Sequence, residues 1–413
     1  MKLKLREDAA YVIENTLKEI NPHKAVQEAL LGYTEKAYIF AIGKAAWTMA
    51  KAAWEALGEN VSGGVVITKY DHSMGEIGDL CIFEAGHPLP DENSVAASKY
   101  ALNLFSNLSE NDNIIFLISG GGSALFESPE DGVTLKDVEG LSKELLYCGA
   151  DIKQINTVRK RLSGVKGGKF AKICEPAKIY SIILSDVLGD DPSFIASGPA
   201  YADLSGPDAA VKIINKYNIK VAGHLLPFLK KELPAHITNA ETRIIGSVSQ
   251  LCKTVSEILQ GLGYTTYILT ENMSCQAREA GGLIGSIAAQ NAVNPAFNTP
   301  CAIILGGETV VKVTGKGKGG RNQEITLSAA SHIAGLSNVC IFSLGSDGTD
   351  GPTDAAGGVV DGDSYKKYLD FGITPEECLN NNDAYSLLKA CGDLLVTGPT
   401  GTNINDVTVV LIR

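Results

Sequence analysis

The chain has 413 residues, 45% of them hydrophobic and 20% charged, which is typical of a globular protein of two or three domains. Its net charge of −11 argues against a nucleic-acid partner, because phosphate backbones require a dense basic face. No apolar run approaches the length of a bilayer span, and nine scattered cysteines without paired spacing argue against structural zinc and favour reduced thiols in the cytoplasm.

The first half of the chain alternates short apolar runs with helical patterns, which predicts a Rossmann-like, doubly wound parallel sheet. It begins with an amphipathic helix that carries acidic residues and does not resemble a signal peptide. A polar helical stretch, 211–233, ends at Pro234 and is expected to form the junction after a first domain of residues 1–238. The predicted strands are 37–43, 63–69, 79–86, 113–119 and 178–186, and the predicted helices are 44–57, 94–108, 134–149 and 151–163.

The second half restarts the pattern and predicts a mixed-sheet α/β domain over residues 239–413. Residues 301–320 are expected to form a hairpin that turns at Gly306-Gly307 and ends in a glycine–lysine loop. The last two strands are expected to include antiparallel pairing. The other predicted strands are 242–250, 264–270, 338–348, 393–398 and 406–413, and the predicted helices are 275–290 and 322–336.

A glycine loop follows the most apolar strand of the first half, with the sequence Ser119-Gly120-Gly121-Gly122-Ser123. Successive glycines expose backbone N–H groups, and a helix start beyond them would add its positive dipole end. A tight turn is the simpler explanation, but the position directly after a buried strand favours binding of a phosphate or carboxylate.

Lys44 occupies a similar position, because Gly43-Lys44 follows strand 37–43 at a predicted helix start. A lysine there can place its ammonium group on an anion that the helix start already holds. A solvated lysine at a helix end fits the position equally well.

The loop 315–321, GKGKGGR, contains the spacing G-x-G-x-x-G but lacks the acidic residue that a dinucleotide ribose requires about twenty positions later. Its cations Lys316, Lys318 and Arg321 fit phosphate better than nicotinamide. The sequence has no GxxxxGK[ST] motif, so it does not belong to the P-loop enzymes.

Acidic residues lie at several strand ends, where a magnesium–nucleotide site would require them. Glu308 follows the turn at Gly306-Gly307. Any one of these acids alone is more often part of a glycine-rich turn. The strand-end acids are Asp186, Asp190 and Asp191 in one loop and Asp347, Asp350 and Asp354 in another.

Two arginines, Arg159 and Arg161, are predicted on a helix close to Lys166 and Lys169. They either close over an anionic substrate or face solvent, and the frequency of basic surface helices favours solvent.

Seven motifs in order make the chain resemble the class II glycerate kinases, the family of glycerate 2-kinases that ends in a MOFRL domain. The resemblance covers nearly the whole length. Its carriers are AIGKAAWTM (41–49), ISGGGSALF (118–126), INTVRKRLSGVKGGK (155–169), LSDVLGDDPSFIASGP (184–199), GGRNQEITLSAA (319–330), GSDGTDGPTDAAGG (345–358) and TGTNINDV (400–407).

The resemblance implies phosphorylation of D-glycerate by ATP with Mg²⁺, most simply at the 2-hydroxyl, in a cleft between the two domains. It implies that Lys44 and Arg321 are the catalytic cations, with Glu308, Asp347 and Asn403 nearby; Asn403 is indicated by the resemblance alone. Residues 119–123, Lys316 and Lys318 would bind substrate or nucleotide, and Asp186 or Asp347 would hold Mg²⁺ or orient the hydroxyl.

Two other functions remain open from the sequence. An NAD(P)-dependent hydroxypyruvate reductase is the first, because relatives of this family have carried that name, although the lysine-rich loop without its acid argues against it. A non-catalytic regulator that binds a sugar acid or nucleotide is the second, and it would need an additional partner-binding segment. Whether the chain is a monomer or a homo-oligomer is also left open.

Overall fold

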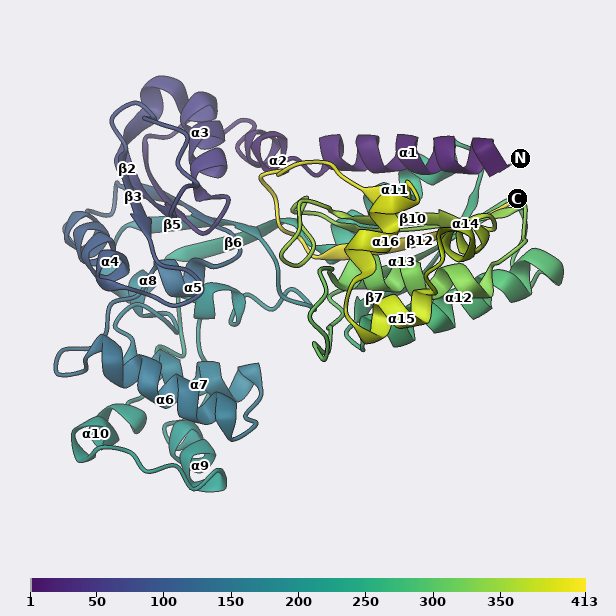
Figure 1. Cartoon of the computed structure of the whole chain (residues 1–413). Helices are drawn as coiled ribbons and strands as arrows, with labels where there is room; N and C mark the ends of the chain where they lie inside the picture. The colour runs from purple at the N-terminus through teal and green to yellow at the C-terminus, as the bar shows by residue number, and fades with distance from the viewer. Residues whose placement is uncertain (1) are drawn as a thin grey trace. The chain divides into compact units, whose positions relative to one another are not determined.

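The computed structural model describes residues 2–413, with side chains from Lys4 onward, and it divides into two compact units. The parallel-sheet unit is Pro22–Ile245, and the mixed-sheet unit comprises Gly246–Arg413 and the chain before Pro22 (Figure 1). The predicted ranges 1–238 and 239–413 differ from these units in two ways. The N-terminal helix packs with the second unit, and the division falls after Ile245.

The parallel-sheet unit contains a six-stranded sheet in the order β3-β2-β1-β4-β5-β6, and the pairs from β3 to β5 are parallel. This is the strand order of a doubly wound Rossmann fold, so the predicted fold class is confirmed. The order reverses between β1 and β4, and ligands bind at the carboxyl ends of strands at such a reversal. The strands are β1 (Ala37–Ile42), β2 (Val61–Lys69), β3 (Cys81–Ala85), β4 (Asn113–Ile118), β5 (Lys178–Leu184) and β6 (Ala240–Gly246).

The helices of this unit begin where short polar side chains can cap them. Asp91, Thr134 and Asp151 each accept the N–H three residues on, which satisfies a donor that the helix itself leaves unpaired. The helices are α2 (Pro22–Ala29), α3 (Ala46–Leu57), α4 (Glu92–Phe105), α5 (Gly122–Leu125), α6 (Leu135–Tyr147), α7 (Ile152–Leu162), α8 (Lys169–Cys174), α9 (Ala209–Lys216) and α10 (Leu226–Leu229).

The core of the parallel-sheet unit is aromatic on one face of its sheet. Phe40 of β1 stacks on Phe116 of β4 with ring centroids 4.9 Å apart, and Phe105, Phe126 and Phe170 pack around them, all buried. Burial of these rings fixes β1 against β4 and therefore fixes the loops at their carboxyl ends.

The segment 211–233 was predicted as a helical junction, and the structure shows it as α9, a 3-10 turn and α10. Helices α9 and α10 lie beside α6 and α7 (Figure 1). Apolar side chains of the segment, among them Ile214, Leu225 and Leu229, pack with residues of α6 and α7 in a separate small core. The segment is therefore a helical layer inside the parallel-sheet unit.

The mixed-sheet unit contains a second six-stranded sheet in the order β11-β10-β9-β12-β8-β7. Only β7 and β8 pair in parallel, which confirms the predicted mixed sheet. The strands are β7 (Thr265–Met273), β8 (Cys301–Gly307), β9 (Val339–Gly345), β10 (Gly357–Asp361), β11 (Leu394–Leu395) and β12 (Asp406–Ile412). The helices are α1 (Lys2–Glu19), α11 (Val248–Gly261), α12 (Ala277–Val293), α13 (Arg321–His332), α14 (Ser364–Phe371), α15 (Pro375–Asn380) and α16 (Ala384–Ala390).

The predicted hairpin over 301–320 is wrong. Strand β8 pairs with β7 and β12, and residues 308–320 form no strand beyond one bridge between Gln276 and Val310. Polar anchors hold helix α1 to this unit: Arg6 bonds Asp361 and Asp393, and Asp8 bonds Tyr264 and Arg413.

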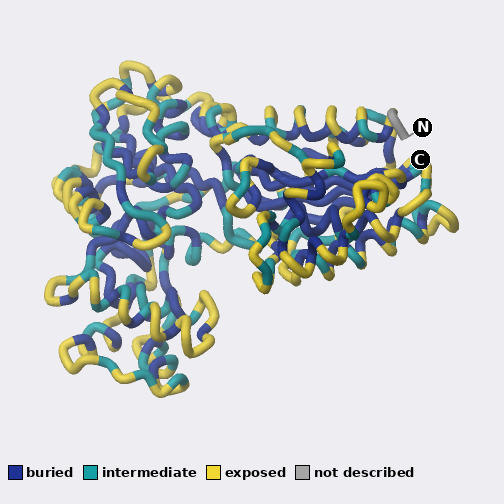
Figure 2. The backbone as a smooth tube through the Cα atoms, in the orientation of Figure 1, coloured by how far each residue is buried: buried dark blue, intermediate teal, exposed yellow. Residues whose placement is uncertain are grey.

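Figure 2 shows buried backbone through the sheet of each unit and exposed residues on outer helices and loops. None of the helices in residues 2–413 is both long and apolar enough to cross a membrane.

Candidate functional site

The loops after β1 and β4 are tied together at the reversal of strand order. The backbone N–H of Lys44 donates to the Gly120 carbonyl (2.9 Å), and the N–H of Ala45 donates to Ser119 Oγ (3.1 Å). Gly43 permits this approach, because a Cβ there would lie 2.2 Å from Ser119 Oγ and its φ is +119°. Lys44 thus precedes helix α3 and lies beside the glycine loop, so the structure brings these predicted residues together.

The glycine loop presents unused donors. The N–H groups of Gly120 and Gly121 donate to no acceptor in the described part of the chain, whereas the N–H of Gly122 bonds the Ser119 carbonyl (3.2 Å). Consecutive free N–H groups form an anion-binding concavity. Helix α5 has only four residues and contributes less dipole than the sequence predicted.

His87 borders this loop and was missed in the sequence. A Cβ on Gly121 would lie 2.8 Å from His87 Nε2 and 3.5 Å from Lys44 Cγ, so both side chains flank the same glycine. Burial, together with Lys44, Lys69 and His72, lowers the pKa of His87 to about 4, which leaves the imidazole neutral near pH 7. Within residues 4–413, no side chain forms a hydrogen bond with the His87 imidazole. The sequence could have indicated His87 through its position just after β3, because the carboxyl end of β3 lies at the same edge of the sheet as the glycine loop.

Ser123 joins the glycine loop to the segment after β5. Its Oγ lies 2.9 Å from Ser197 Oγ, which in turn donates to Asn156 Oδ1 (3.3 Å). Ala196 and Ser197 have φ of +48° and +63°, a left-handed conformation that costs about 1–3 kcal/mol for such residues. Strain of this kind clusters at functional sites, and neither residue was singled out in the sequence, although both fall within the motif LSDVLGDDPSFIASGP.

The predicted acids after β5 lie in the same segment. Asp186 follows the strand, and Asp190 has a φ of +53°. Asp190 Oδ1 is buried and has no hydrogen-bond partner within residues 4–413, while Asp191 Oδ1 accepts the N–H of Ser193 (2.9 Å). An unpaired buried carboxylate oxygen is a ligand suited to a hard cation.

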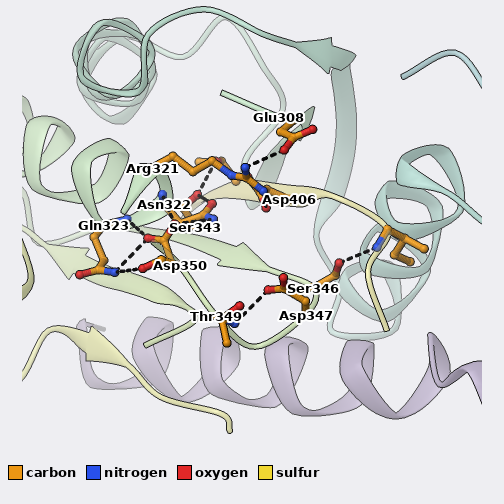
Figure 3. Close-up of polar contacts among 12 residues, drawn as sticks. Glu308, Arg321, Asn322, Gln323, Ser343, Ser346, Asp347, Thr349, Asp350 and Asp406 are labelled. Atoms are coloured by element: carbon orange, nitrogen blue, oxygen red, sulfur yellow. Dashed lines mark hydrogen bonds and ion pairs between the residues drawn. The ribbon is translucent and has the colours of Figure 1, made fainter. Parts of the chain in front are cut away.

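A second cluster surrounds Arg321, the first residue of α13 (Figure 3). Arg321 Nε and Nη2 donate to the two carboxylate oxygens of Asp406 (2.5 and 3.1 Å), and Nη1 donates to Glu308 Oε1 (2.7 Å). The Glu308 side chain is 45% exposed and that of Asp406 only 5%. Burial raises the pKa of Asp406 to about 7, opposed by Arg321. Asp406 was missed, although it falls within the motif TGTNINDV.

Asp350 occupies the N-terminus of α13. Its carboxylate accepts the N–H groups of Asn322 (3.2 Å) and Gln323 (2.9 Å), and burial raises its pKa while these N–H groups lower it. A Cβ on Gly320 would lie 2.3 Å from Asp350 Cγ. The start of the helix that follows the predicted phosphate loop 315–321 therefore already holds a carboxylate.

The glycine–lysine loop also uses its own donors. The N–H groups of Gly315, Lys316 and Lys318 donate to the side chains of Asn382, Asn381 and Asp383 in turn, at 2.9 to 3.1 Å. The glycines serve close packing, since a Cβ on Gly315 would lie 2.1 Å from the Asn381 carbonyl oxygen. Lys318 Nζ lies 4.7 Å from the centre of the Tyr385 ring, and Lys316 is exposed. An anion bound at residues 315–318 would therefore depend on side chains.

Asp347 and the segment containing Asn403 lie together. Asp347 Oδ1 accepts the N–H of Thr349 (2.9 Å; Figure 3), and the Asp347 carbonyl accepts the N–H of Thr400 (3.3 Å). The N–H of Ile404, which follows the half-buried Asn403, donates to Ser346 Oγ (2.9 Å). The structure thus brings the Asn403 segment, predicted from resemblance alone, beside the loop of Asp347.

Comparisons with known proteins agree with this architecture. A family model described as a domain of unknown function, DUF4147, matches residues 8–230, and one described as the MOFRL family matches residues 301–406. The chain is 47% identical to the D-glycerate 2-kinase of Thermotoga maritima, covering 99% of this chain and 98% of that protein. It is 40% identical to a glycerate 2-kinase of Pyrococcus horikoshii, covering 99% and 97%.

A solved structure of glycerate kinase from Thermotoga maritima superposes with a TM-score of 0.96 at 46% identity, covering 99% of this chain and 100% of that one. Both halves of the sequence are matched by family models, and both relatives align over almost their full length. The chain therefore belongs to the class II glycerate kinases, the glycerate 2-kinase family with a MOFRL domain.

Proposed function

We propose that this protein is an ATP-dependent kinase that phosphorylates D-glycerate at its 2-hydroxyl. The observation that carries the proposal is the 47% identity to a D-glycerate 2-kinase over 99% of the chain. The geometry supports the proposal, since Lys44 lies beside the glycine loop 119–123 where the strand order reverses, and two N–H groups of that loop are unused. Such a loop binds anionic oxygens, which both substrates possess.

In the proposed mechanism, Lys44 neutralises charge on the transferring phosphoryl group. Its backbone is fixed to Gly120, so the ammonium group starts from a defined position beside the loop. The N–H groups of Gly120 and Gly121 would hold a phosphate or the glycerate carboxylate. Donors held in place before the reaction stabilise developing charge without reorganisation, which is the main contribution in phosphoryl transfer.

Arg321 is the second proposed cation. Nε and Nη2 of the Arg321 guanidinium donate to Asp406, and Nη1 donates to the exposed Glu308 carboxylate. Substrate oxygens can compete with Glu308 for Nη1, because that pair is solvent-exposed and therefore weak. Asp406 would keep the guanidinium plane in place during the exchange. Asn403 and Asp347 are proposed to contact or orient the substrate.

Mg²⁺ is the metal that ATP brings to such a site, and the carboxylates present fit it. No group of three His, Cys, Asp or Glu side chains within the described residues could hold a metal ion alone. Kinase magnesium needs only one or two carboxylates plus phosphate oxygens. We propose Asp186 or Asp347 as ligand, and the unpaired Asp190 Oδ1 adds a third candidate. When bound, the ion neutralises charge on the phosphates.

We further propose that Lys44 and Arg321 serve one reaction, so that substrate binding must bring the two units onto the same ligand. X-ray scattering with D-glycerate and a non-hydrolysable ATP analogue is then expected to show compaction. Unchanged scattering with both ligands demonstrably bound would contradict this part of the proposal.

The test of the activity is ATP consumption with D-glycerate and Mg²⁺, with the product offered directly to enolase. Enolase accepts 2-phosphoglycerate, so an immediate signal supports transfer to the 2-hydroxyl, and a signal only after addition of a mutase indicates the 3-hydroxyl. Turnover of NADH with hydroxypyruvate, without ATP consumption, would instead support the reductase. The loop 315–321 gives that alternative little support, because the N–H groups of Gly315, Lys316 and Lys318 are used within the protein.

A further inference from the structure

Helix α7 carries three consecutive cations, and two of them have polar partners, although Nε of Arg161 is buried without one. Lys160 pairs with Asp203 (2.8 Å), both side chains being nearly buried. Arg161 is buried, and its terminal nitrogens donate to the carbonyls of Thr157 (2.8 Å), Gly206 (2.6 Å) and Ser205 (3.2 Å). The expectation that Arg161 faces solvent or substrate is therefore wrong, because its donors are used to hold the chain at 205–206.

Arg159 has no such partners. Its guanidinium makes no hydrogen bond or ion pair with any side chain or carbonyl in the described part of the chain, and its Nε is buried. It lies close enough to Lys166 that its charge helps to lower the pKa of that lysine to about 8, with burial the larger cause. Lys166 is paired with the buried Glu127 (2.9 Å), whereas Arg159 has no carboxylate partner among the described residues. A half-buried cation without a counter-ion is costly unless a ligand supplies the negative charge.

The neighbours of Arg159 lead to the glycine loop from two directions. Asn156, one turn earlier on the same face of α7, accepts from Ser197, which contacts Ser123 at the end of the loop. Lys166 Nζ donates to the Phe126 carbonyl (2.9 Å), directly after α5. Residues near Arg159 thus reach residues 123–126 directly, through Lys166, and through Ser197, by way of Asn156.

We propose that Arg159 is an anion-binding residue of the glycine-loop site and pairs with a carboxylate or phosphate oxygen held by residues 119–123. Two substrate groups share this chemistry, the glycerate carboxylate and a nucleotide phosphate, and their identity rests on the proposed function. A planar guanidinium can donate two parallel N–H bonds to either group. The unpaired charge in the free protein is then the counterpart of the ligand's negative charge.

The test compares Arg159→Gln and Arg159→Lys with Lys153→Gln, which removes an exposed cation from the same helix. Arg159→Gln is expected to raise KM for one substrate roughly 10- to 100-fold, the range for a lost charge-assisted hydrogen bond. The affected substrate identifies the group, glycerate for the carboxylate or ATP for a phosphate. The melting temperature should stay equal or rise, since a charge without a partner is removed. Lys should rescue only partly, and Lys153→Gln should leave both KM values unchanged.

A second readout separates this inference from the activity. Thermal stabilisation of the protein by D-glycerate alone and by MgATP alone is measured for wild type and Arg159→Gln. Loss of one stabilisation in the variant supports the inference even if wild type shows no turnover, which would contradict only the proposed function. A lower melting temperature with unchanged KM and unchanged stabilisation would assign Arg159 a structural role and overturn the inference. So would a variant indistinguishable from wild type in every measurement.

Discussion

Arg321 and Asp406 form a two-point contact, in which Nε and Nη2 of the guanidinium each reach a different oxygen of the carboxylate. The arginine begins helix α13 and the aspartate begins strand β12, so the pair joins two elements 85 residues apart in sequence. Because both contacts lie in one plane, the remaining nitrogen, Nη1, has a fixed direction toward Glu308.

Replacement of Arg321 by Lys is expected to be nearly as damaging as replacement by Ala. A lysine offers one point charge and cannot contact Asp406 and a substrate oxygen in the same fixed geometry. We expect kcat to fall on the order of 10³-fold for both variants, as for other arginines that stabilise phosphoryl transfer. Steady-state kinetics would measure this, and full activity in Arg321→Lys would leave Arg321 with only a long-range electrostatic role.

Asp406→Asn is expected to change the pH profile as well as the rate. The carboxyl has a pKa raised to about 7, so it is mostly protonated below pH 7 and then cannot accept both N–H bonds of Arg321. Wild-type kcat should therefore fall as the pH drops through about 7. Asn lacks this titration, so the variant should show a lower kcat without that decline. An identical acid limb in both proteins would assign it to another group.

Lys44→Ala is expected to reduce kcat on the order of 10²–10³-fold while leaving the fold intact, because the side chain borders the glycine loop and its backbone bond to Gly120 remains. Lys51→Ala, which removes a lysine paired with Glu55 on the surface of α3, is the control. Circular dichroism checks the fold. A kcat within a few-fold of wild type would make Lys44 a surface charge.

The conformation of the glycine loop can be tested with a matched pair of substitutions. Gly121 has φ +84° and faces the His87 ring, whereas Gly149 has φ +80° and open space around it. Both Gly→Ala changes carry the backbone cost of a left-handed alanine, about 1–2 kcal/mol. Only Gly121→Ala should also displace His87 and impair catalysis. Equal effects of the two changes on activity and melting temperature would show that contact with His87 is unimportant.

His87 should make stability sensitive to mild acid. Its pKa is about 4 in the folded protein, below the ordinary value of 6.5, so the unfolded chain binds an additional proton between these values. The neutral His87 imidazole therefore costs no stability above pH 6.5, and the free energy of unfolding decreases as the pH falls from 6.5 toward 4. The melting temperature of His87→Asn should accordingly decline less than that of wild type between pH 7 and pH 5. Parallel declines would indicate a normal histidine.

Sequence patterns sufficed for those parts of the fold that depend on local signals. The apolar strands, the glycine loop after β4 and the placement of Lys44 beside it follow from buried runs that end in glycine, and the strand order then brings β1 beside β4. The fold class and the family were predicted correctly for this reason. Strand β10 and helices α14 to α16 were missed, because β10 is short, opens with two glycines and lies among turn-forming residues.

The use of each polar group depends on partners that the sequence places far away. The loops 119–123 and 315–321 look alike as glycine-rich loops, yet in the second the N–H groups of Gly315, Lys316 and Lys318 are taken by residues 381–383. Arg159 and Arg161 also look alike, and carbonyls at 205–206 distinguish them. Such differences arise from tertiary contacts, for which local spacing carries no signal.

Helix α1 is synthesised well before several of the residues that hold it. Arg6 bonds Asp361 and Asp393, and Asp8 bonds Arg413, with at least 355 residues between the members of each pair. At roughly 5–20 residues per second, the nascent helix is expected to remain without these three partners for about 20–80 s. The parallel-sheet unit can fold completely in that interval, so one apolar face of helix α1 is available to chaperones until these partners are made.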